Sequence, residues 1–283
     1  MDPVLNIPLP GGGLELGAYS TLYVLAWLTA PLLAALAARR AGLPLSRALV
    51  VYGVALAAGV VGARVLDLFV AWRFYADAPS RIWGLAFQGF SLYGGLVVAT
   101  LTGIALARRL ALDVWKLADA AVPALVLGVA LMRTGCFLRG CCFGVECGEL
   151  PWGVTYPLGS PAWELQVANG RLGLIQALGG GSAAPVHPTQ LYEIAAVVVM
   201  GLVALAVARR GAPTGVPFLL FAAGFTAFRL GNGFLRERQE VITAPEWFYP
   251  LFYTALIAVI VSLIGRRLAA HRVRREDELS RYP

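Results

Sequence analysis

Charged residues are scarce in this sequence. Asp, Glu, Lys and Arg make up 14% of the 283 residues, whereas they make up roughly 25% of ordinary soluble domains. Apolar residues make up 59%, and the mean hydropathy is +0.72. Several windows carry almost no charge over the ~20 residues that a helix needs to cross a hydrocarbon core of roughly 30 Å. The composition excludes an ordinary soluble domain and predicts an all-α, polytopic membrane protein.

Other features are also missing. The first residues, MDPVLNIPLPGGG, lack the basic segment and the cleavage site of a signal peptide, so we expect them to remain on the mature protein. No internal repeat is evident, and no polar stretch is long enough to fold alone, which favours a single transmembrane domain over residues 1–283. The net charge of +7 is not gathered on one amphipathic element. We therefore expect no nucleic-acid partner.

About seven apolar stretches are candidate spans, and they cover residues 17–38, 48–72, 92–107, 117–138, 188–208, 215–235 and 247–264. One set of connections carries 14 of the 23 basic residues, namely Arg39, Arg40, Arg47, Arg108, Arg109, Lys116, Arg209, Arg210, Arg266, Arg267, Arg272, Arg274, Arg275 and Arg281. The other set carries six, namely Arg73, Arg81, Arg139, Arg171, Arg236 and Arg238. Because cytoplasmic connections are enriched in Lys and Arg, the sequence predicts an N-terminus outside and a C-terminus in the cytoplasm.

The same topology puts the longest connection, about residues 139–187, outside the cytoplasm as a loop or head region. It also puts a basic tail, about residues 265–283, inside. The outer connection is rich in Pro, Gly and Trp and contains a GGGS run at residues 179–182. Connections this long are usually functional or disordered. We expect this one to serve as a lid or a docking surface.

Three arginines remain within or near the ends of spans: Arg64, Arg133 and Arg229. Each costs several kcal/mol in hydrocarbon unless it faces protein, water or a counter-ion. The acidic candidates nearby are Asp67, Asp119 and Glu193. Arg64 lies one helical turn from Asp67, and Glu193 could pair with another arginine. Structural pairing and substrate binding both stay open for Arg64 and Glu193.

Arg133 and Arg229 are more informative, because glycines follow both of them in RTGCFLRG and RLGNGFLRER. Guanidinium groups beside exposed backbone amides suit a phosphate. An ion path would instead need polar residues on several spans through the full thickness of the membrane. The two arginines therefore favour the binding of an anionic lipid head group.

The four cysteines, Cys136, Cys141, Cys142 and Cys147, have the spacing C-x4-C-C-x4-C. Structural zinc sites normally begin with ligands two to four residues apart, and iron–sulfur motifs are spaced differently. We therefore expect no metal and no other cofactor. A disulfide from Cys141 or Cys142 to Cys147 stays open, and Cys136 is interpreted as a small residue that permits close helix packing.

Five motifs resemble those of the bacterial prolipoprotein diacylglyceryl transferase family, in the same order and spacing. They are FSLYGGL at residues 90–96, RTGCFLRGCCFG at 133–144, PWGVTYP at 151–157, HPTQLYE at 187–193 and FRLGNGFLR at 228–236. The resemblance covers almost the whole chain. It implies seven transmembrane helices in the bacterial plasma (inner) membrane, with the N-terminus outside and the active site toward the outer leaflet.

The resemblance also implies a reaction. The diacylglyceryl group of phosphatidylglycerol would pass to the lipobox cysteine thiol of a preprolipoprotein, which forms a thioether and releases glycerol phosphate. The implied partners are phosphatidylglycerol, the lipobox peptide and the surrounding membrane lipids.

Candidate residues follow from the resemblance and from the charge pattern together. The catalytic candidates are Arg133, Arg229, Tyr93 and His187. An alternative role for His187 is to position the start of a span, because Pro188 follows it. The substrate-binding candidates are Tyr19, Arg64, Gly94, Gly95, Arg139, Gly140, Gly144, Glu193 and Arg236.

Some residues depart from the family pattern. Tyr93 stands where many members have histidine, and a phenol with an ordinary pKa of about 10 does not act as a base at neutral pH. Cys136 and Cys141 replace an asparagine and an acidic residue, and Gly233 replaces a glutamate. Three alternatives therefore stay open: a paralogue with another acceptor, a non-catalytic phospholipid-binding or transport protein, and a thiol-redox enzyme.

Overall fold

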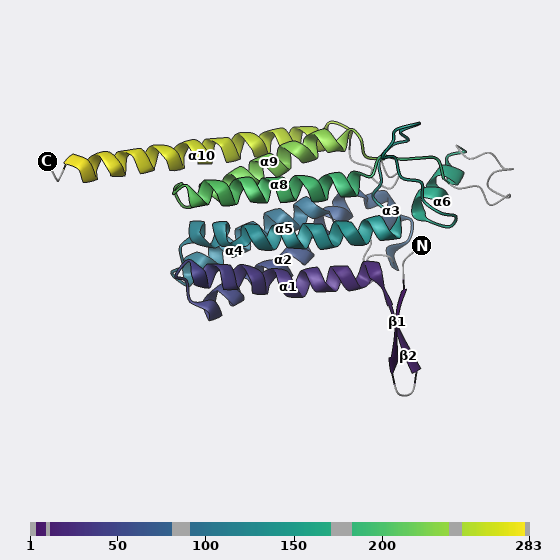
Figure 1. Cartoon of the computed structure of the whole chain (residues 1–283), viewed down its shortest axis with the longest axis horizontal. Helices are drawn as coiled ribbons and strands as arrows, with labels where there is room; N and C mark the ends of the chain where they lie inside the picture. Colours follow the sequence, from purple (N-terminus) through teal and green to yellow (C-terminus); the bar gives the residue numbers. More distant parts are fainter. Residues whose placement is uncertain (1–3, 10–11, 81–90, 171–182, 238–244, 281–283) are drawn as a thin grey trace. The chain divides into compact units, whose positions relative to one another are not determined.

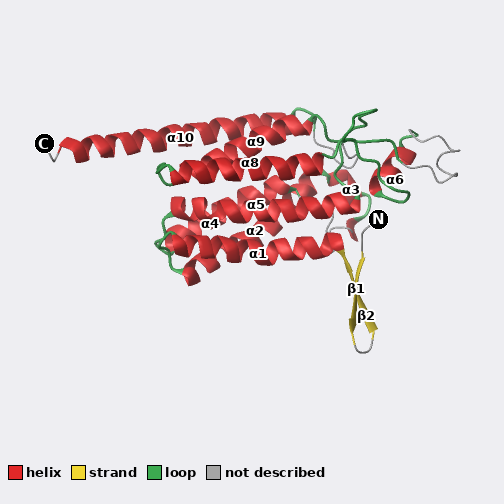
Figure 2. Ribbon diagram, viewed as in Figure 1, coloured by secondary structure: helices red, strands yellow, loops and turns green. Residues whose placement is uncertain are grey.

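The structure is a computed structural model that describes residues 4–9, 12–80, 91–170, 183–237 and 245–280. Most of these residues are helical (Figure 2). The helices, labelled in Figure 1, are α1 Ala18–Arg40, α2 Leu45–Val70, α3 Trp72–Ala76, α4 Leu92–Arg109, α5 Val114–Arg139, α6 Pro161–Ala168, α8 Thr189–Arg209, α9 Val216–Gly233 and α10 Phe248–Ser280. Part of the predicted topology rests on Arg81, Arg171, Arg238, Arg281 and residues 179–182, which lie outside the described residues.

The predicted helical membrane class is confirmed. Among the described residues, five helices are long and apolar enough to cross a membrane: α1, α2, α5, α8 and Phe248–Asp277 within α10. The other two predicted spans, 92–107 and 215–235, correspond to α4 and α9, which have 18 residues each. The count of seven spans and the orientation of the termini stay predictions.

A β-hairpin near the N-terminus was not expected from the sequence. Strands β1 Val4–Leu9 and β2 Gly12–Gly17 pair antiparallel, with Val4 opposite Gly17 and Leu9 opposite Gly12 (Figure 1). Each strand has only six residues, so it offers a short alternating pattern. The prolines and glycines within it favour a turn over a strand.

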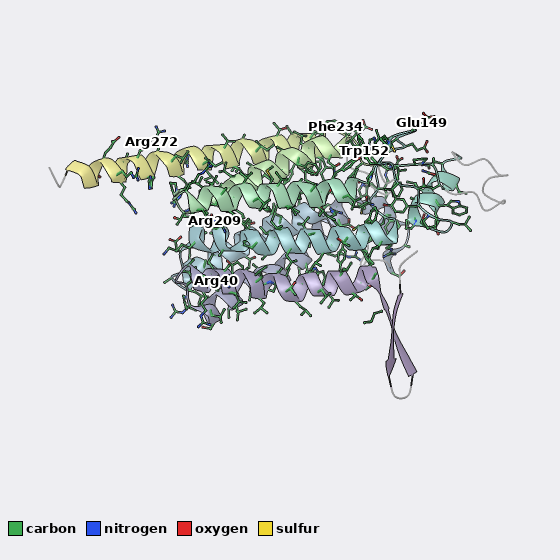
Figure 3. The ribbon with its side chains drawn as sticks, viewed as in Figure 1. Arg40, Glu149, Trp152, Arg209, Phe234 and Arg272 are labelled. Atoms are coloured by element: carbon green, nitrogen blue, oxygen red, sulfur yellow. The ribbon has the colours of Figure 1, made fainter. Side chains whose placement is uncertain are left out.

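The chain divides into two compact units, each described by itself. Unit 1 consists of Met1–Leu28, Leu127–Val197 and Gly231–Arg238, and unit 2 consists of Thr29–Val126, Val198–Leu230 and Gln239–Pro283. Arg40 ends α1 and Arg209 ends α8, and both lie at the same end of unit 2 (Figure 3). This placement agrees with the prediction that the two arginines belong to one set of connections.

Glycines bring α2 and α4 together in unit 2. A Cβ atom added to Gly62 would lie 2.7 Å from the carbonyl oxygen of Gly94, and one added to Gly59 would lie 3.1 Å from that of Gly95. Backbone atoms in a packed interface cannot move aside as the end of a flexible side chain can. These glycines therefore allow the two helices to approach closely.

Asp119 in α5 was considered as a partner for an arginine, and the structure gives it a further role. Its carboxylate accepts hydrogen bonds from the backbone N–H groups of Gly215 at 2.7 Å and Phe218 at 2.9 Å. The first N–H groups of a helix have no intrahelical partner, and the helix dipole favours a negative charge beside them. Asp119 therefore caps the start of α9.

Asp119→Ala is expected to lower the free energy of unfolding by about 1–2 kcal/mol, because two N–H groups at the start of α9 lose their acceptor. Asp119→Asn keeps a side-chain oxygen in the same place and should cost less. Denaturant titration of the purified protein in detergent micelles measures both variants. Equal losses from Ala and Asn would contradict a capping role.

Part of the predicted head region has its own apolar core in unit 1. The buried cluster consists of Phe143, Tyr156, Ala162 and Val186. Isolated antiparallel bridges join Gly144 to Arg236 and Val154 to Val186. Ser160 caps α6 by accepting a hydrogen bond from the N–H of Trp163 at 3.2 Å. These contacts fix the segments that lead into the candidate site.

Candidate functional site

Helix α5 ends within the first arginine motif. Gly140 has a φ of +74°, which glycine adopts without a steric penalty. The N–H of Cys141 donates to the carbonyl oxygen of Cys136 at 3.0 Å. This hydrogen bond, together with the left-handed glycine, forms a Schellman motif. The motif turns the chain back toward Cys136, so the predicted candidate Gly140 has a structural role.

A buried carboxylate joins two of the predicted arginines in unit 1. Glu193 in α8 is 1% exposed, and its Oε2 atom forms an ion pair with Nε of Arg133. Its Oε1 atom lies 3.8 Å from Nη1 of Arg236 and accepts a hydrogen bond from Nδ2 of Asn232 at 3.4 Å. Pairing with an arginine, one of the two roles left open for Glu193, is therefore present. Asn232 was missed, although it lies within the motif RLGNGFLR.

This cluster of Arg133, Glu193 and Arg236 has more positive than negative charge. Two guanidinium groups and one carboxylate sum to +1, while the side chains of Arg133 and Arg236 are 14% and 25% exposed. Removing charges from water is costly, and one carboxylate compensates only one of the two cations. A phosphate beside the two guanidinium groups would supply the missing negative charge. The arrangement therefore suits an anionic ligand.

Gly144 holds the segment that carries Arg236. Its N–H donates to the carbonyl oxygen of His187 at 2.9 Å, and the N–H of Val145 donates to that of Leu235 at 2.8 Å. A Cβ atom at Gly144 would lie 2.7 Å from Cβ of His187. Glycine at position 144 therefore lets three chain segments approach one another closely. This close packing explains why a glycine is needed here.

His187 belongs to a chain of hydrogen bonds. Its Nδ1 atom lies 3.2 Å from the hydroxyl of Tyr192, and that hydroxyl accepts a hydrogen bond from Nε1 of Trp152 at 2.8 Å. The backbone N–H of His187 donates to the carbonyl oxygen of Val145 at 3.1 Å. These contacts agree with a residue that positions the start of α8. Its role as a base stays a prediction.

Two substrate-binding candidates, Tyr19 and Arg139, contact each other. The guanidinium carbon of Arg139 lies 4.7 Å from the centre of the Tyr19 ring, within cation–π range. The Tyr19 ring lies 4.5 Å from that of Tyr23, whose hydroxyl is 3.5 Å from Sγ of Cys136. Tyr23 was missed, and its spacing of four residues from Tyr19 in α1 is the signal that places both on one helix face.

Three of the four cysteines come together. The Sγ atoms of Cys136, Cys141 and Cys142 all lie within 4.8 Å of one another. Cys147 lies elsewhere, beside Gly153, where a Cβ atom would be 2.6 Å from its sulfur. All four thiols are free. The disulfide to Cys147 that the sequence left open is therefore not formed.

Contacts within this cluster shift two thiol pKa values in opposite directions. Hydrogen bonds with Cys136 and Cys141 lower the pKa of Cys142 well below its ordinary value, and the charges of Arg236 and Arg133 act in the same direction. Hydrogen bonds with Cys136 and Cys142 raise the pKa of Cys141. Cys142 is therefore the thiol of this pair that ionises more readily.

In unit 2 the other predicted arginine lies beside the predicted tyrosine. The guanidinium carbon of Arg229 is 6.0 Å from the centre of the Tyr93 ring, and these residues are 9% and 3% exposed. The Tyr93 ring also packs against Phe252 at 5.3 Å and Tyr253 at 4.8 Å, measured between ring centres. Tyr93 therefore belongs to a buried aromatic cluster next to Arg229.

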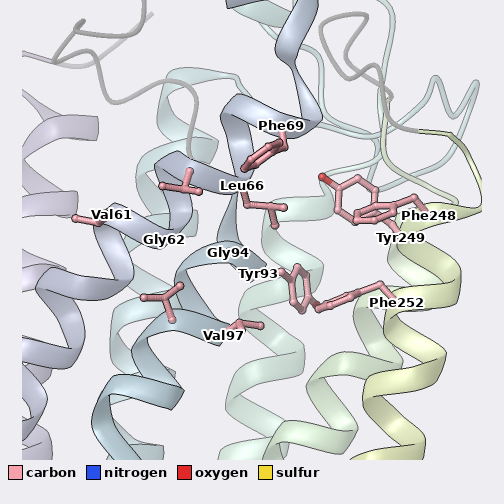
Figure 4. Close-up of a pocket in the computed structure, with 12 residues that line it drawn as sticks. Val61, Gly62, Leu66, Phe69, Tyr93, Gly94, Val97, Phe248, Tyr249 and Phe252 are labelled. Carbon is pink, nitrogen blue, oxygen red and sulfur yellow. The ribbon is translucent and has the colours of Figure 1, made fainter. Parts of the chain in front are cut away.

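An apolar cavity of about 430 Å³ opens beside this cluster in unit 2. Its lining comes from α2, α4 and α10 and includes Leu66, Phe69, Tyr93, Gly94 and Phe252 (Figure 4). An apolar lining of this kind favours hydrocarbon over water. The predicted candidate Gly94 therefore contributes both to the contact between α2 and α4 and to the cavity.

Arg64 is connected to Asp67 through a residue that sequence analysis missed. Its Nη1 atom lies 3.3 Å from the hydroxyl of Tyr75, which donates a hydrogen bond to Oδ2 of Asp67 at 2.5 Å. Burial and the hydrogen bond to Asp67 raise the pKa of Tyr75 to about 12. Tyr75 lies in α3, so this contact depends on the turn after α2. The structural pairing considered for Arg64 is thus indirect.

Known proteins match nearly the whole chain. The family model of prolipoprotein diacylglyceryl transferase matches residues 7–270. A phosphatidylglycerol–prolipoprotein diacylglyceryl transferase of Geobacter sulfurreducens is 31% identical over 264 residues, which cover 89% of this chain and 93% of that protein. One of Dehalococcoides mccartyi is 27% identical over 227 residues, which cover 80% and 76%. The motifs, the helices and these matches agree, and the chain belongs to the prolipoprotein diacylglyceryl transferase family.

Proposed function

We propose that this protein transfers the diacylglyceryl group of phosphatidylglycerol to the thiol of a lipobox cysteine in a preprolipoprotein. The observation that carries the proposal is the cluster of Arg133, Glu193 and Arg236, with a surplus charge of +1. Such a cluster suits the phosphate of an anionic lipid. The names of the related proteins contain the same lipid and the same kind of acceptor.

The reaction forms a bond between sulfur and carbon. The thiol loses its proton, and the thiolate attacks the lipid glycerol carbon that carries the phosphate. The carbon–oxygen bond breaks, its electron pair stays on the phosphate oxygen, and glycerol phosphate leaves. Negative charge therefore grows on the phosphate in the transition state. Arg133 and Arg236 would stabilise this growing charge more than the charge of the bound lipid, which is the condition for catalysis.

The apolar cavity in unit 2 would favour hydrocarbon, such as an acyl chain, over water. Tyr93 would orient Arg229 and not act as a base, since a phenol keeps its proton at neutral pH. Arg229 is proposed as a catalytic residue through its buried positive charge. His187 stays the candidate for a base that acts through its imidazole.

The remaining candidates are proposed to bind substrate. Tyr19 and Arg139, which contact each other, would present an aromatic ring and a cation to the head group or the peptide. We further propose that the chain has seven spans in the bacterial plasma membrane, with the N-terminus outside and the basic tail in the cytoplasm. The active site would then face the outer leaflet, with residues 139–187 as the surface that receives the peptide.

A direct test incubates the purified protein with phosphatidylglycerol and a lipobox peptide and then weighs the peptide by mass spectrometry. The expected result is a gain of one diacylglyceryl group on the cysteine, and a peptide with serine at this position should gain nothing. An intact protein that binds phosphatidylglycerol but leaves the thiol peptide unchanged would overturn the proposal. That result would favour a different acceptor or a non-catalytic lipid-binding protein.

A further inference from the structure

Three sulfur atoms meet where α5 ends. Cys136 lies in the last turns of the helix, while Cys141 and Cys142 follow it, and their Sγ atoms are all within 4.8 Å of one another. In tetrahedral zinc sites the Zn–S distance is about 2.3 Å, so that sulfur ligands lie roughly 3.8 Å apart. Three thiols already this close need side-chain movements of only about an ångström to reach that spacing.

The backbone around these thiols is held by several specific contacts. The Schellman hydrogen bond from Cys141 to Cys136 returns the chain over the helix end. The carbonyl oxygens of Cys141 and Cys142 accept hydrogen bonds from the side chains of Gln190 at 2.6 Å and Thr189 at 2.8 Å. Cys142 has a φ of +62°, a conformation that residues with a Cβ atom adopt rarely and that is enriched at functional sites. Partners outside the ligand set commonly orient metal ligands in this way.

The proposed transfer also needs a way to form a thiolate. Tyr93 keeps its proton at neutral pH, and its ring packs against Phe252 and Tyr253. A metal ion can take the place of a base such as His187, the remaining candidate, because a thiol that coordinates Zn²⁺ loses its proton. Catalytic zinc sites have three protein ligands and an open fourth position, and three protein thiols lie close together here.

We propose that Cys136, Cys141 and Cys142 bind a Zn²⁺ ion whose fourth coordination position receives the lipobox thiolate. This assignment rests on the transferase function proposed above and identifies how its nucleophile is formed. It reverses the expectation from cysteine spacing, because the helix end brings together residues that are not in a zinc-motif spacing. The spacing of the three cysteines in the sequence did not show that their side chains lie close together.

Each step balances in atoms and charge. The peptide thiol binds the zinc ion as a thiolate and releases its proton to solvent. A sulfur lone pair forms the bond to the lipid glycerol carbon, the carbon–oxygen bond breaks, and glycerol phosphate leaves with the electron pair. The product thioether is neutral and a weaker ligand than a thiolate, so it leaves the metal. No oxidation or reduction takes place.

The surrounding charges fit this site. Zn²⁺ with three thiolates carries a net charge of −1, and the positive charge of the adjacent Arg133 favours an anion at this place. Nη1 of Arg133 lies 3.8 Å from Sγ of Cys136. An arginine proposed to bind the leaving phosphate therefore adjoins a proposed metal ligand. The nucleophile and the leaving phosphate would both be bound at this site, on opposite sides of the lipid glycerol carbon, as an in-line displacement requires.

The first test measures metal in the full-length protein purified without chelators. We expect about one zinc ion per chain in the wild type and in Cys147→Ser, whose thiol lies outside the cluster, and less than about 0.1 in Cys142→Ser. Wild-type protein stripped of metal and loaded with Co²⁺ should show the absorption bands of tetrahedral thiolate coordination. Absence of zinc together with absence of these bands would overturn the site, as would equal metal loss in both variants.

The second test adds lipobox peptide to the cobalt-loaded wild type. A peptide with cysteine should shift the visible bands as its sulfur enters the fourth position, and a peptide with serine should not. Equal spectra with both peptides would overturn the proposed role. Metal-free wild type that still transfers at the full rate would also overturn it, but would leave the transferase function standing. If neither form transfers, the transferase function fails, and the cobalt spectra alone then decide whether the metal site exists.

Discussion

Arg133→Gln is expected to lower the rate of diacylglyceryl transfer by roughly 100- to 1000-fold, the usual effect of removing one group that stabilises charge in a transition state. Glutamine keeps a polar side chain but removes the positive charge, so the surplus of +1 in the Arg133, Glu193 and Arg236 cluster falls to zero. Arg133→Lys keeps the charge and loses the planar fork of donors. It should lie between wild type and Arg133→Gln.

The same substitution also affects stability. Glu193 is 1% exposed, and removing one partner of a buried ion pair typically costs about 3–5 kcal/mol. The double variant Arg133→Gln/Glu193→Gln removes both charges and should regain most of the free energy of unfolding without regaining transfer. Arg40→Gln, at the exposed end of α1 (Figure 3), is the matched control and should change neither quantity.

Two measurements separate these effects. Mass spectrometry of the lipobox peptide gives the transfer rate, and denaturant titration in detergent micelles gives the free energy of unfolding. Recovery of transfer in the double variant would contradict the proposal, because it would mean that Arg133 matters only through its pairing with Glu193.

Gly94→Ala is expected to lower the free energy of unfolding by about 1–3 kcal/mol, the usual cost of adding atoms to a packed interface. The new Cβ atom would collide with the carbonyl oxygen of Gly62 and would lie 2.5 Å from Cβ of Leu66. Both atoms belong to α2, so relief requires that α2 and α4 move apart. Because Gly94 also lines the apolar cavity, we expect weaker binding of phosphatidylglycerol as well.

Gly53→Ala provides the control for helix propensity. Gly53 lies on α2 with nothing within 4 Å of an added Cβ atom, so alanine there should be neutral or stabilising by up to about 1 kcal/mol. Denaturant titration and a phosphatidylglycerol binding assay compare the two variants. If both alanines change stability equally, the close contact of α2 and α4 does not explain the glycine at position 94.

Part of the arginine cluster could be predicted from the sequence. Arg133 was a candidate because charge in or beside a membrane span is costly without a partner, and the possible pairing of Glu193 followed the same argument. Arg236 was a candidate through the motif FRLGNGFLR. Asn232 escaped notice because a neutral amide carries no such cost. The hydrogen bond that it donates to Glu193 depends on how α8 and the end of α9 meet.

Other features were not predicted because they depend on turns of the chain. The hairpin of β1 and β2 was missed because proline and glycine interrupt its alternating pattern. Tyr75 joins Arg64 and Asp67 only because a turn follows α2. The spacing of the cysteines did not show that three thiols meet, because this meeting depends on the return of the chain over a helix end.

By itself, the sequence determined that the chain is a helical membrane protein of the diacylglyceryl transferase family. Long uncharged stretches and local motifs carry that information without reference to other parts of the chain. Only the tertiary structure decided that Glu193 joins Arg133 and Arg236, and that three thiols meet at the end of α5. These contacts depend on helix packing and on one left-handed glycine, and neither hydropathy nor residue spacing encodes distances of a few ångströms between such segments.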